Sequence, residues 1–212
     1  MFITFEGGEG VGKTTLISAL QMHFSSLGFR VLVTREPGGT LLGQKIRQLL
    51  LNNHEVTITK KGELLLFLAD RSQHVEEKIL PFLKQGGIVL CDRYIDSTFA
   101  YQSDAFSFND LLMLNEYATN HLFPDKTFYL DLDPEIGRKR ILEERKSLLD
   151  KMEEKDLAFH QKVRGEFLKL KELFHDRIVK IDAAQSKETV YNEVRNFITG
   201  MIHERSLHKH TS

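Results

Sequence analysis

The 212-residue chain has little cysteine, no excess charge of either sign and no long apolar run. Its single cysteine, Cys91, excludes a framework of internal disulfide bonds and fits a buried thiol in a reducing compartment. The formal net charge of -1 argues against a general nucleic-acid binder, which would carry a strongly basic balance. No stretch approaches the roughly 18 consecutive apolar residues of a membrane span. These absences predict a cytoplasmic protein that binds neither nucleic acid nor a membrane.

The sequence indicates a single domain without a targeting segment. The amino terminus reads as a strand and a loop, and it lacks the basic and apolar regions of a secretory signal. There is no internal repeat, low-complexity tract or linker. With 41% apolar and 28% charged residues, the chain suits one globular domain. We expect this domain to cover residues 1–205 and to be followed by a disordered tail at 206–212.

Short β-rich runs alternate with longer segments in which apolar residues recur at helical spacing. The expected strands are 2–5, 30–34, 88–91, 127–132 and 177–181. The expected helices are 13–27, 41–51, 62–83, 110–120, 134–146, 156–175 and 187–202. Pro81 is expected to bend or end the third helix near its last turn. This alternation predicts an α/β fold with three layers, α/β/α, around a mostly parallel five-stranded sheet.

A glycine-rich motif follows the first expected strand. Residues 7–14 read GGEGVGKT, which matches the pattern G-x-x-x-x-G-K-[ST] of the phosphate loop, or P-loop. Its glycines permit positive φ angles, so consecutive N–H groups can point into one anion-sized concavity, and the next helix adds its positive dipole end. We therefore predict a P-loop NTPase fold that binds a nucleoside triphosphate. The expected ATP-binding residues are Gly7, Gly8, Glu9, Gly10, Val11, Gly12, Lys13, Thr14 and Thr15.

A P-loop alone does not distinguish a motor, a switch and a kinase. The sequence lacks the N/T-K-x-D motif of guanine-nucleotide switches and the Asp-Glu strand end of motor ATPases. Instead, the strand at 88–91 is followed by Asp92, Arg93 and Tyr94. An arginine beside the aspartate suits a second anionic phosphate in the same cleft. This arrangement favours phosphoryl transfer between two nucleotides.

Four segments, spread over most of the chain, resemble the thymidylate kinase family. They are EGGEGVGKTT at 6–15, TREPGGT at 34–40, the pair Phe67 and Arg71 in FLADR, and DRY followed by STFAYQ within 92–102. The resemblance implies that the γ-phosphoryl group of ATP passes to dTMP, giving dTDP for dTTP biosynthesis. It also implies that Mg²⁺ is the cofactor, that Thr14 and Asp92 are the residues that hold it, and that the protein forms a homodimer.

The resemblance assigns roles on the acceptor side. Phe67 and Arg71 lie on one helical face because they are four residues apart; the family stacks this ring on thymine and binds a thymine carbonyl with the arginine. Core packing for Phe67 and a solvated position for Arg71 are the alternatives. Arg35 and Arg93 are expected to clamp the acceptor phosphate. The expected acceptor-binding residues are Arg35, Glu36, Pro37, Phe67, Arg71, Arg93, Thr98, Tyr101 and Gln102.

Three further positions carry expectations from the family. Glu9 corresponds to an acidic residue that engages the sugar 3′-hydroxyl and the acceptor-side arginines. Asp92 is expected either to hold Mg²⁺ through water or to fix Arg93. Tyr101 is expected to crowd the sugar 2′ position and so to disfavour ribonucleotides. For Tyr101 and its neighbours in the same segment, ordinary packing is the alternative.

Basic residues gather in a segment that we expect to act as a lid, at about 138–156. One family subtype carries a basic residue in the P-loop and another carries it in the lid; because this loop has Gly10 and Val11, the lid is expected to supply the charge. Arg145 is the first candidate and Arg140 the second, whereas Lys151 lacks the bidentate fork of an arginine. A solvated helix is the alternative. The expected catalytic residues are Lys13, Arg93, Glu9 and Arg145.

Two rival functions remain at this level. One is a deoxynucleoside kinase or another monophosphate kinase with a related cleft. The other is a nucleotide-binding regulatory module that has lost catalysis, and the presence of Lys13, Thr14, Asp92 and Arg93 speaks against it. The chain also departs from the family at 103–107, where a glycine-rich stretch is common and SDAFS stands instead.

Overall fold

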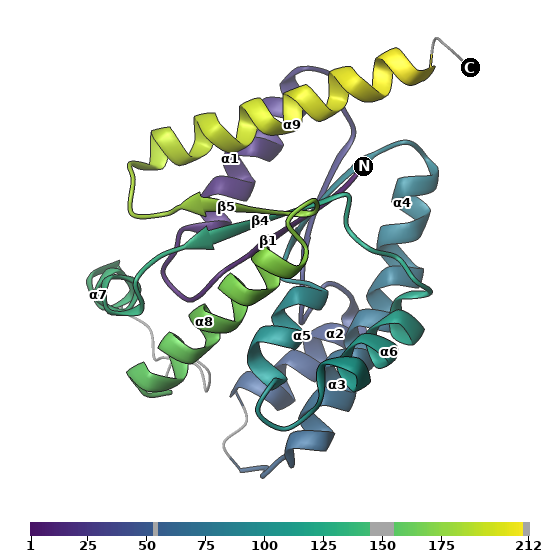
Figure 1. The fold of residues 1–212 in the computed structure, drawn as a ribbon. Coiled ribbons are helices and arrows are strands. Elements are labelled where there is room, and N and C mark those ends of the chain that lie inside the picture. Colours follow the sequence, from purple (N-terminus) through teal and green to yellow (C-terminus); the bar gives the residue numbers. More distant parts are fainter. Residues whose placement is uncertain (53–54, 145–154, 210–212) are drawn as a thin grey trace.

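The computed structural model describes residues 1–52, 55–144 and 155–209 (Figure 1). Its five strands form one sheet in the order β2-β3-β1-β4-β5, and every neighbouring pair is parallel. The strands are β1 (Phe2–Glu6), β2 (Val31–Arg35), β3 (Ile88–Asp92), β4 (Lys126–Asp131) and β5 (Ile178–Asp182). Each strand boundary lies within a residue of its predicted position. The predicted α/β class with a five-stranded sheet is confirmed.

Helices cover both faces of the sheet (Figure 1). Side chains alternate along each strand, so Ile3 and Phe5 pack toward α1 (Lys13–Ser26) and α9 (Lys187–Lys209), whereas Phe2 faces the opposite core. The helices on that opposite side are α3 (Lys60–His74), α4 (Leu80–Lys84), α5 (Ile95–Gln102), α6 (Phe108–Thr119) and α8 (Leu157–Leu173). Two further helices, α2 (Leu41–Arg47) and α7 (Pro134–Glu144), lie near the ends of the strands.

The predicted helix at 62–83 is continuous but not uniform. After α3 the chain forms a wider π-helical turn, η2 (Val75–Ile79), before α4. Pro81 lacks an N–H, and its ring crowds the carbonyl one turn earlier, so a wider turn lets the helix pass it. The predicted helix at 41–51 likewise divides into α2 and a π-helical turn, η1 (Gln48–Asn52).

Two helical segments differ from the sequence prediction. Helix α5 was not predicted, because eight residues give too short a pattern to separate from a loop. Helix α9 runs to Lys209, beyond its predicted end at 202, so residues 206–209 of the predicted disordered tail are helical. Its last residues contain neither proline nor glycine after Gly200, and nothing in their type ends a helix.

Parallel strands bring the predicted motifs to one edge of the sheet. Arg35 and Phe5 both pair with Asp92, at the carboxyl ends of β2, β1 and β3. Ligands of open α/β sheets bind outside these carboxyl ends, where the strand order changes direction. Among the described residues, no helix is both long and apolar enough to cross a membrane.

Candidate active site

The P-loop joins β1 to α1 through glycine conformations that other residues rarely adopt. Gly12 precedes α1 with a φ of 90°, in the left-handed region. A side chain at Gly7 would place its Cβ 2.5 Å from the carbonyl oxygen of Leu130. Lys13 begins α1, and its Nζ donates to the carbonyl oxygens of Gly7 (3.1 Å) and Gly8 (2.9 Å). Burial and the nearby positive charge of Arg93 lower the pKa of Lys13. The acidic neighbours act to raise it, but the pKa is lowered overall.

A broad hollow opens over this loop. It is lined by loop residues from Glu9 to Thr15, by Arg35, Asp92 and Arg93, and by residues after β5. Arg140 of α7 also lines it and donates to the carbonyl oxygen of Ala183 at 3.1 Å. Of the candidate lid residues, Arg145 and Lys151 lie outside the described residues. The hollow therefore brings together the predicted metal residues and the predicted triphosphate residues apart from Gly7 and Gly8.

A second hollow lies beside the first and shares Glu9, Glu36, Arg47 and Arg93 with it. It brings together the predicted acceptor-binding residues apart from Arg35, which lines the broad hollow instead. The predicted residues that line it are Glu9, Glu36, Pro37, Phe67, Arg71, Arg93, Thr98, Tyr101 and Gln102. Arg47, Leu51 and Ser97 line it as well. Ser97 opens the STFAYQ segment but was not predicted as a contact, and no motif marks Arg47 or Leu51.

Glu9 and Arg93 stand between the two hollows and line both. Arg93 Nη2 lies 2.6 Å from Glu9 Oε1, and the guanidinium carbon lies 5.2 Å from the centre of the Tyr101 ring. Arg93 has a φ of 68°, a left-handed conformation that is unusual for arginine. Burial acts to lower the pKa of Arg93, but Tyr101 and the acidic groups around it raise the pKa overall. The guanidinium is thus a permanent cation at the junction.

Glu6, at the end of β1, is fully buried and was missed by the sequence analysis. Its Oε1 accepts from the backbone N–H of Tyr94 (2.7 Å), and its Oε2 accepts from Ser97 Oγ (2.6 Å). Tyr94 precedes α5 without a side-chain cap of its own, so Glu6 takes the place of a capping carboxylate. Burial, with a smaller contribution from Asp96, raises the pKa of Glu6 to about 7. Glu6 therefore ties the P-loop strand to the helix that carries Thr98, Tyr101 and Gln102.

Arg71 is buried, with 2% of its surface exposed, so the solvated alternative for it is wrong. Its Nε donates to Glu36 Oε2 at 2.7 Å, and its Nη2 donates to the carbonyl oxygen of Tyr94 at 2.9 Å. Its Nη1 donates to Thr98 Oγ1 at 2.6 Å and also to Asn115 Oδ1. Within the described ranges, these bonds occupy all but one of the five N–H donors of a guanidinium.

Two buried oxygen atoms of the site have no hydrogen-bond partner among the described residues: Asp92 Oδ1 and Gln102 Oε1. The amide nitrogen of Gln102 donates to Glu63 Oε1 at 2.6 Å, which fixes the orientation of its oxygen. A buried oxygen without a donor is costly, and at a site it points to a ligand. Asp92 Oδ1 and the Thr14 hydroxyl on the same hollow are the hard oxygen donors that Mg²⁺ prefers.

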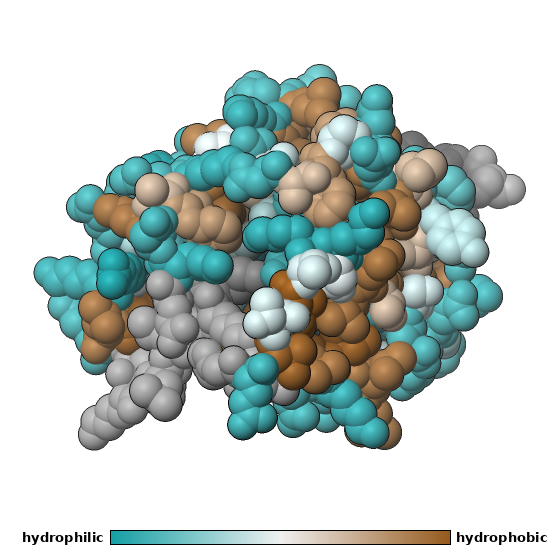
Figure 2. Space-filling view, turned by 90° about the horizontal axis from the view of Figure 1, so that it is seen from below, coloured by the Kyte–Doolittle hydropathy of each residue, from teal (hydrophilic) through white to brown (hydrophobic). Residues whose placement is uncertain are grey.

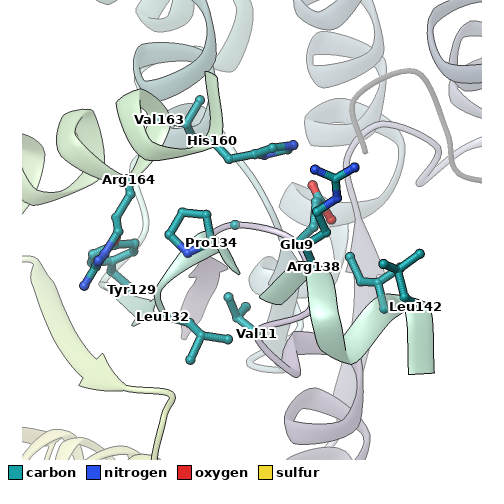
Figure 3. A pocket seen from close by; sticks show the side chains of 12 residues that line it. Glu9, Val11, Tyr129, Leu132, Pro134, Arg138, Leu142, His160, Val163 and Arg164 are labelled. Atoms are coloured by element: carbon teal, nitrogen blue, oxygen red, sulfur yellow. The ribbon is translucent and has the colours of Figure 1, made fainter. Parts of the chain in front are cut away.

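A third hollow lies between the P-loop, the end of β4, α7 and α8 (Figure 3). Arg138 of α7 and Glu9 of the loop line it, with His160 of α8 beside them (Figure 3). Close backbone packing joins the loop to α7 here. A Cβ at Gly10 would lie 2.2 Å from the carbonyl oxygen of Gly137, and a Cβ at Gly137 would lie 2.4 Å from that of Glu9.

Comparison with known proteins agrees with this geometry. A family model described as thymidylate kinase matches residues 5–194. A thymidylate kinase of Acholeplasma laidlawii (strain PG-8A) is 46% identical over 202 residues, which cover 93% of this chain and 98% of that protein. One of Geobacillus sp. (strain WCH70) is 42% identical over 192 residues, covering 90% and 91%. The crystal structure of thymidylate kinase from Ehrlichia chaffeensis matches with a TM-score of 0.76 and 32% identity, covering 93% of this chain and 98% of that one. The chain belongs to the thymidylate kinase family.

Proposed function

We propose that the protein transfers the γ-phosphoryl group of ATP to dTMP, giving dTDP, and that it does so in the cytoplasm with Mg²⁺. The observation that carries this proposal is the meeting of two hollows at Glu9 and Arg93. One hollow has the P-loop of a triphosphate site, and the other has an aromatic side chain and buried polar groups suited to a base. Family membership supplies the identity of the acceptor.

On the donor side, the N–H groups of the P-loop cradle the triphosphate, and Lys13 leaves the loop carbonyls to reach the β- and γ-phosphates. Thr14 and Asp92 would hold Mg²⁺, with Asp92 acting through water. The ion, when bound, neutralises charge on the phosphate oxygens. The buried Asp92 Oδ1 has no donor in the part of the chain that the structure describes, which supports this role over one in which Asp92 only fixes Arg93.

On the acceptor side, the half-buried ring of Phe67 provides a stacking surface for thymine. The remaining N–H of Arg71 donates to a thymine carbonyl. Gln102 Oε1 accepts from the N3–H of thymine, an atom that carries no hydrogen in cytosine. A base that cannot satisfy these buried groups is rejected strongly, because it leaves them unpaired. Arg35 on the neighbouring hollow, together with Arg93, binds the acceptor phosphate.

The transfer proceeds in line, from the γ-phosphorus to an oxygen of the acceptor phosphate, without a covalent enzyme intermediate. Catalysis is then mainly positioning and charge neutralisation. Lys13, Arg93 and a lid cation share the developing charge. Arg145 remains our first candidate for that cation. Arg140 remains the second, and its position on the donor hollow supports it.

Competing acceptors test this function. We expect ADP release with dTMP, release about tenfold slower with dUMP, which lacks one methyl group, and release about 10⁴-fold slower with dCMP. Thymidine should give no turnover, because the phosphate that Arg35 and Arg93 bind is missing. A coupled assay of ADP release with each acceptor at the same concentration makes the measurement. Preference for thymidine or dCMP would assign the site to a different kinase, and ADP release independent of any acceptor would refute the transfer.

We also propose that the protein is a homodimer through the helices α2, α3 and α6. These helices adjoin one another and expose large apolar side chains: Leu41 (78%), Leu65 (53%), Met113 (59%) and Tyr117 (87%). Figure 2 shows the molecule from below, where hydrophobic residues gather near the centre of that face and hydrophilic residues surround them. Sedimentation equilibrium should give twice the chain mass of 24.5 kDa, and Leu65→Glu should reduce it to one chain mass. A monomeric wild-type protein at micromolar concentration would contradict the proposal.

A further inference from the structure

A buried chain of hydrogen bonds lies behind the acceptor hollow, and the mechanism above uses only its last member, Arg71. It runs from Thr34 at the end of β2 through His74 of α3 to Glu36, and from Glu36 to Arg71. His74 has no exposed surface, and it does not line the acceptor hollow. It can therefore act on the site only through its neighbours.

The protonation of His74 follows from its partners. Nδ1 lies 2.9 Å from Glu36 Oε1, and a carboxylate only accepts, so Nδ1 carries the proton of this bond. Nε2 lies 2.6 Å from Thr34 Oγ1, whose hydroxyl donates to it in the neutral imidazole. The backbone of Gly39 packs closely on the imidazole ring: a Cβ at Gly39 would lie only 2.4 Å from Nε2. This close packing holds the ring in its plane.

Glu36 is consequently held by both of its oxygens. Oε1 accepts from His74 and Oε2 accepts from Arg71, two residues three apart on the same face of α3. The backbone N–H of Glu36 donates to the carbonyl oxygen of Asp92 at 2.9 Å, and Asp70 Oδ1 accepts from the N–H of Gly38 at 3.0 Å. Without the bond from His74, the carboxylate could rotate about its last torsion, and the bond that it accepts from Arg71 Nε would change direction with it.

We propose that His74 is a positioning residue for the acceptor base: its Nδ1–H fixes the carboxylate of Glu36, and Glu36 in turn aims the remaining N–H of Arg71 into the acceptor hollow. The inference rests on the proposed function, in which Arg71 binds thymine. This positioning role of His74 differs from a packing role of its imidazole ring in one respect. Only the bond at Nδ1 matters for the acceptor, and the bond at Nε2 does not.

Two amide substitutions separate these bonds. In His74→Asn the side-chain nitrogen lies near the position of Nδ1 and can still donate to Glu36. In His74→Gln the amide reaches the position of Nε2 and can bond only Thr34. We expect His74→Gln and His74→Ala to raise the KM for dTMP about tenfold, with kcat and the KM for ATP changed less than about threefold. His74→Asn should keep the KM for dTMP within about threefold of wild type.

Thr34→Val is the matched control, because it removes the hydroxyl bonded to Nε2 and leaves the Glu36 bond in place. It should also keep the KM for dTMP within about threefold. Thermal unfolding of each variant identifies any that fail to fold. If His74→Ala does not fold, the comparison of the Asn and Gln variants is sufficient for the test. Equal values of the KM for dTMP in the Asn and Gln variants, a larger rise in Asn, or a parallel rise in the KM for ATP would each overturn the positioning role.

Arg71→Ala distinguishes this inference from the function on which it rests. If Arg71→Ala raises the KM for dTMP much more than the KM for ATP while His74→Gln does not, the role of His74 fails and thymine binding by Arg71 stands. If Arg71→Ala leaves the KM for dTMP unchanged, the role of Arg71 fails, and the role of His74 fails with it.

Discussion

Lys13→Ala should lower kcat for ADP formation by about 10³-fold or more. Lys13 begins α1 beneath the broad hollow, is 7% exposed, and is held by the carbonyl oxygens of Gly7 and Gly8. A cation in such a water-poor position acts much more strongly on the transferring phosphate than an exposed one. Single-turnover and steady-state assays of ADP formation, at saturating ATP and dTMP, make the measurement.

The control for this substitution is Lys84→Ala, because Lys84 is an exposed lysine on α4 away from both hollows. It should change kcat by less than about twofold. Thermal unfolding in the presence and absence of ATP separates lost catalysis from lost binding. If Lys13→Ala retains a tenth of the wild-type rate, the P-loop is not the donor site of this reaction.

Arg93→Asn should lower kcat/KM for dTMP by about 10³-fold. Arg93 lines both hollows, so its charge is available to the donor and acceptor phosphates together. Asparagine is the better substitution than alanine because it tolerates the φ of 68° at this position. The variant also leaves Glu9 without its 2.6 Å ion pair, which adds repulsion toward the phosphates.

Arg30→Asn is the control for Arg93, since Arg30 lies on the surface with a 2.7 Å bond to Gln85. It should leave kcat/KM within about twofold of wild type. Arg93→Lys adds a second comparison, because lysine keeps the charge but loses the planar fork. A change in Arg93→Asn confined to a few-fold rise in the KM for dTMP would mean that Arg93 binds the acceptor without acting on the transfer.

The sequence predicted the sheet well because each strand is an apolar run of the length expected for a buried parallel strand. It predicted the P-loop because the whole motif is contiguous. Helix α5 (Ile95–Gln102) was missed because it is short and rich in residues that the sequence analysis interpreted as ligand contacts. The π-helical turns were also missed, since hydrophobic spacing does not distinguish a wide turn from an α-helical one.

The acceptor side could be predicted only where the family supplied a motif. Glu6 bonds residues 88 and 91 positions further along the chain, and His74 bonds Glu36, which lies 38 positions before it. These partners can be identified only from the fold, because the sheet brings the distant segments together. A signal was present for Glu6, because an acidic residue that ends an apolar strand needs a buried partner. No comparable signal marked Asn115, which lies within an ordinary amphipathic helix and bonds Arg71.

The contact between Gly10 and Gly137 bears on how this family can vary. A side chain at position 10 would overlap the carbonyl oxygen of Gly137, and Gly10 itself has a φ of 69°. A P-loop arginine at position 10 therefore cannot be acquired by a single substitution in this chain. The start of α7 would have to move away from the loop in the same evolutionary step. In this chain the packing of α7 on the loop therefore restricts position 10 to glycine, and a larger residue there would require a compensating change at position 137.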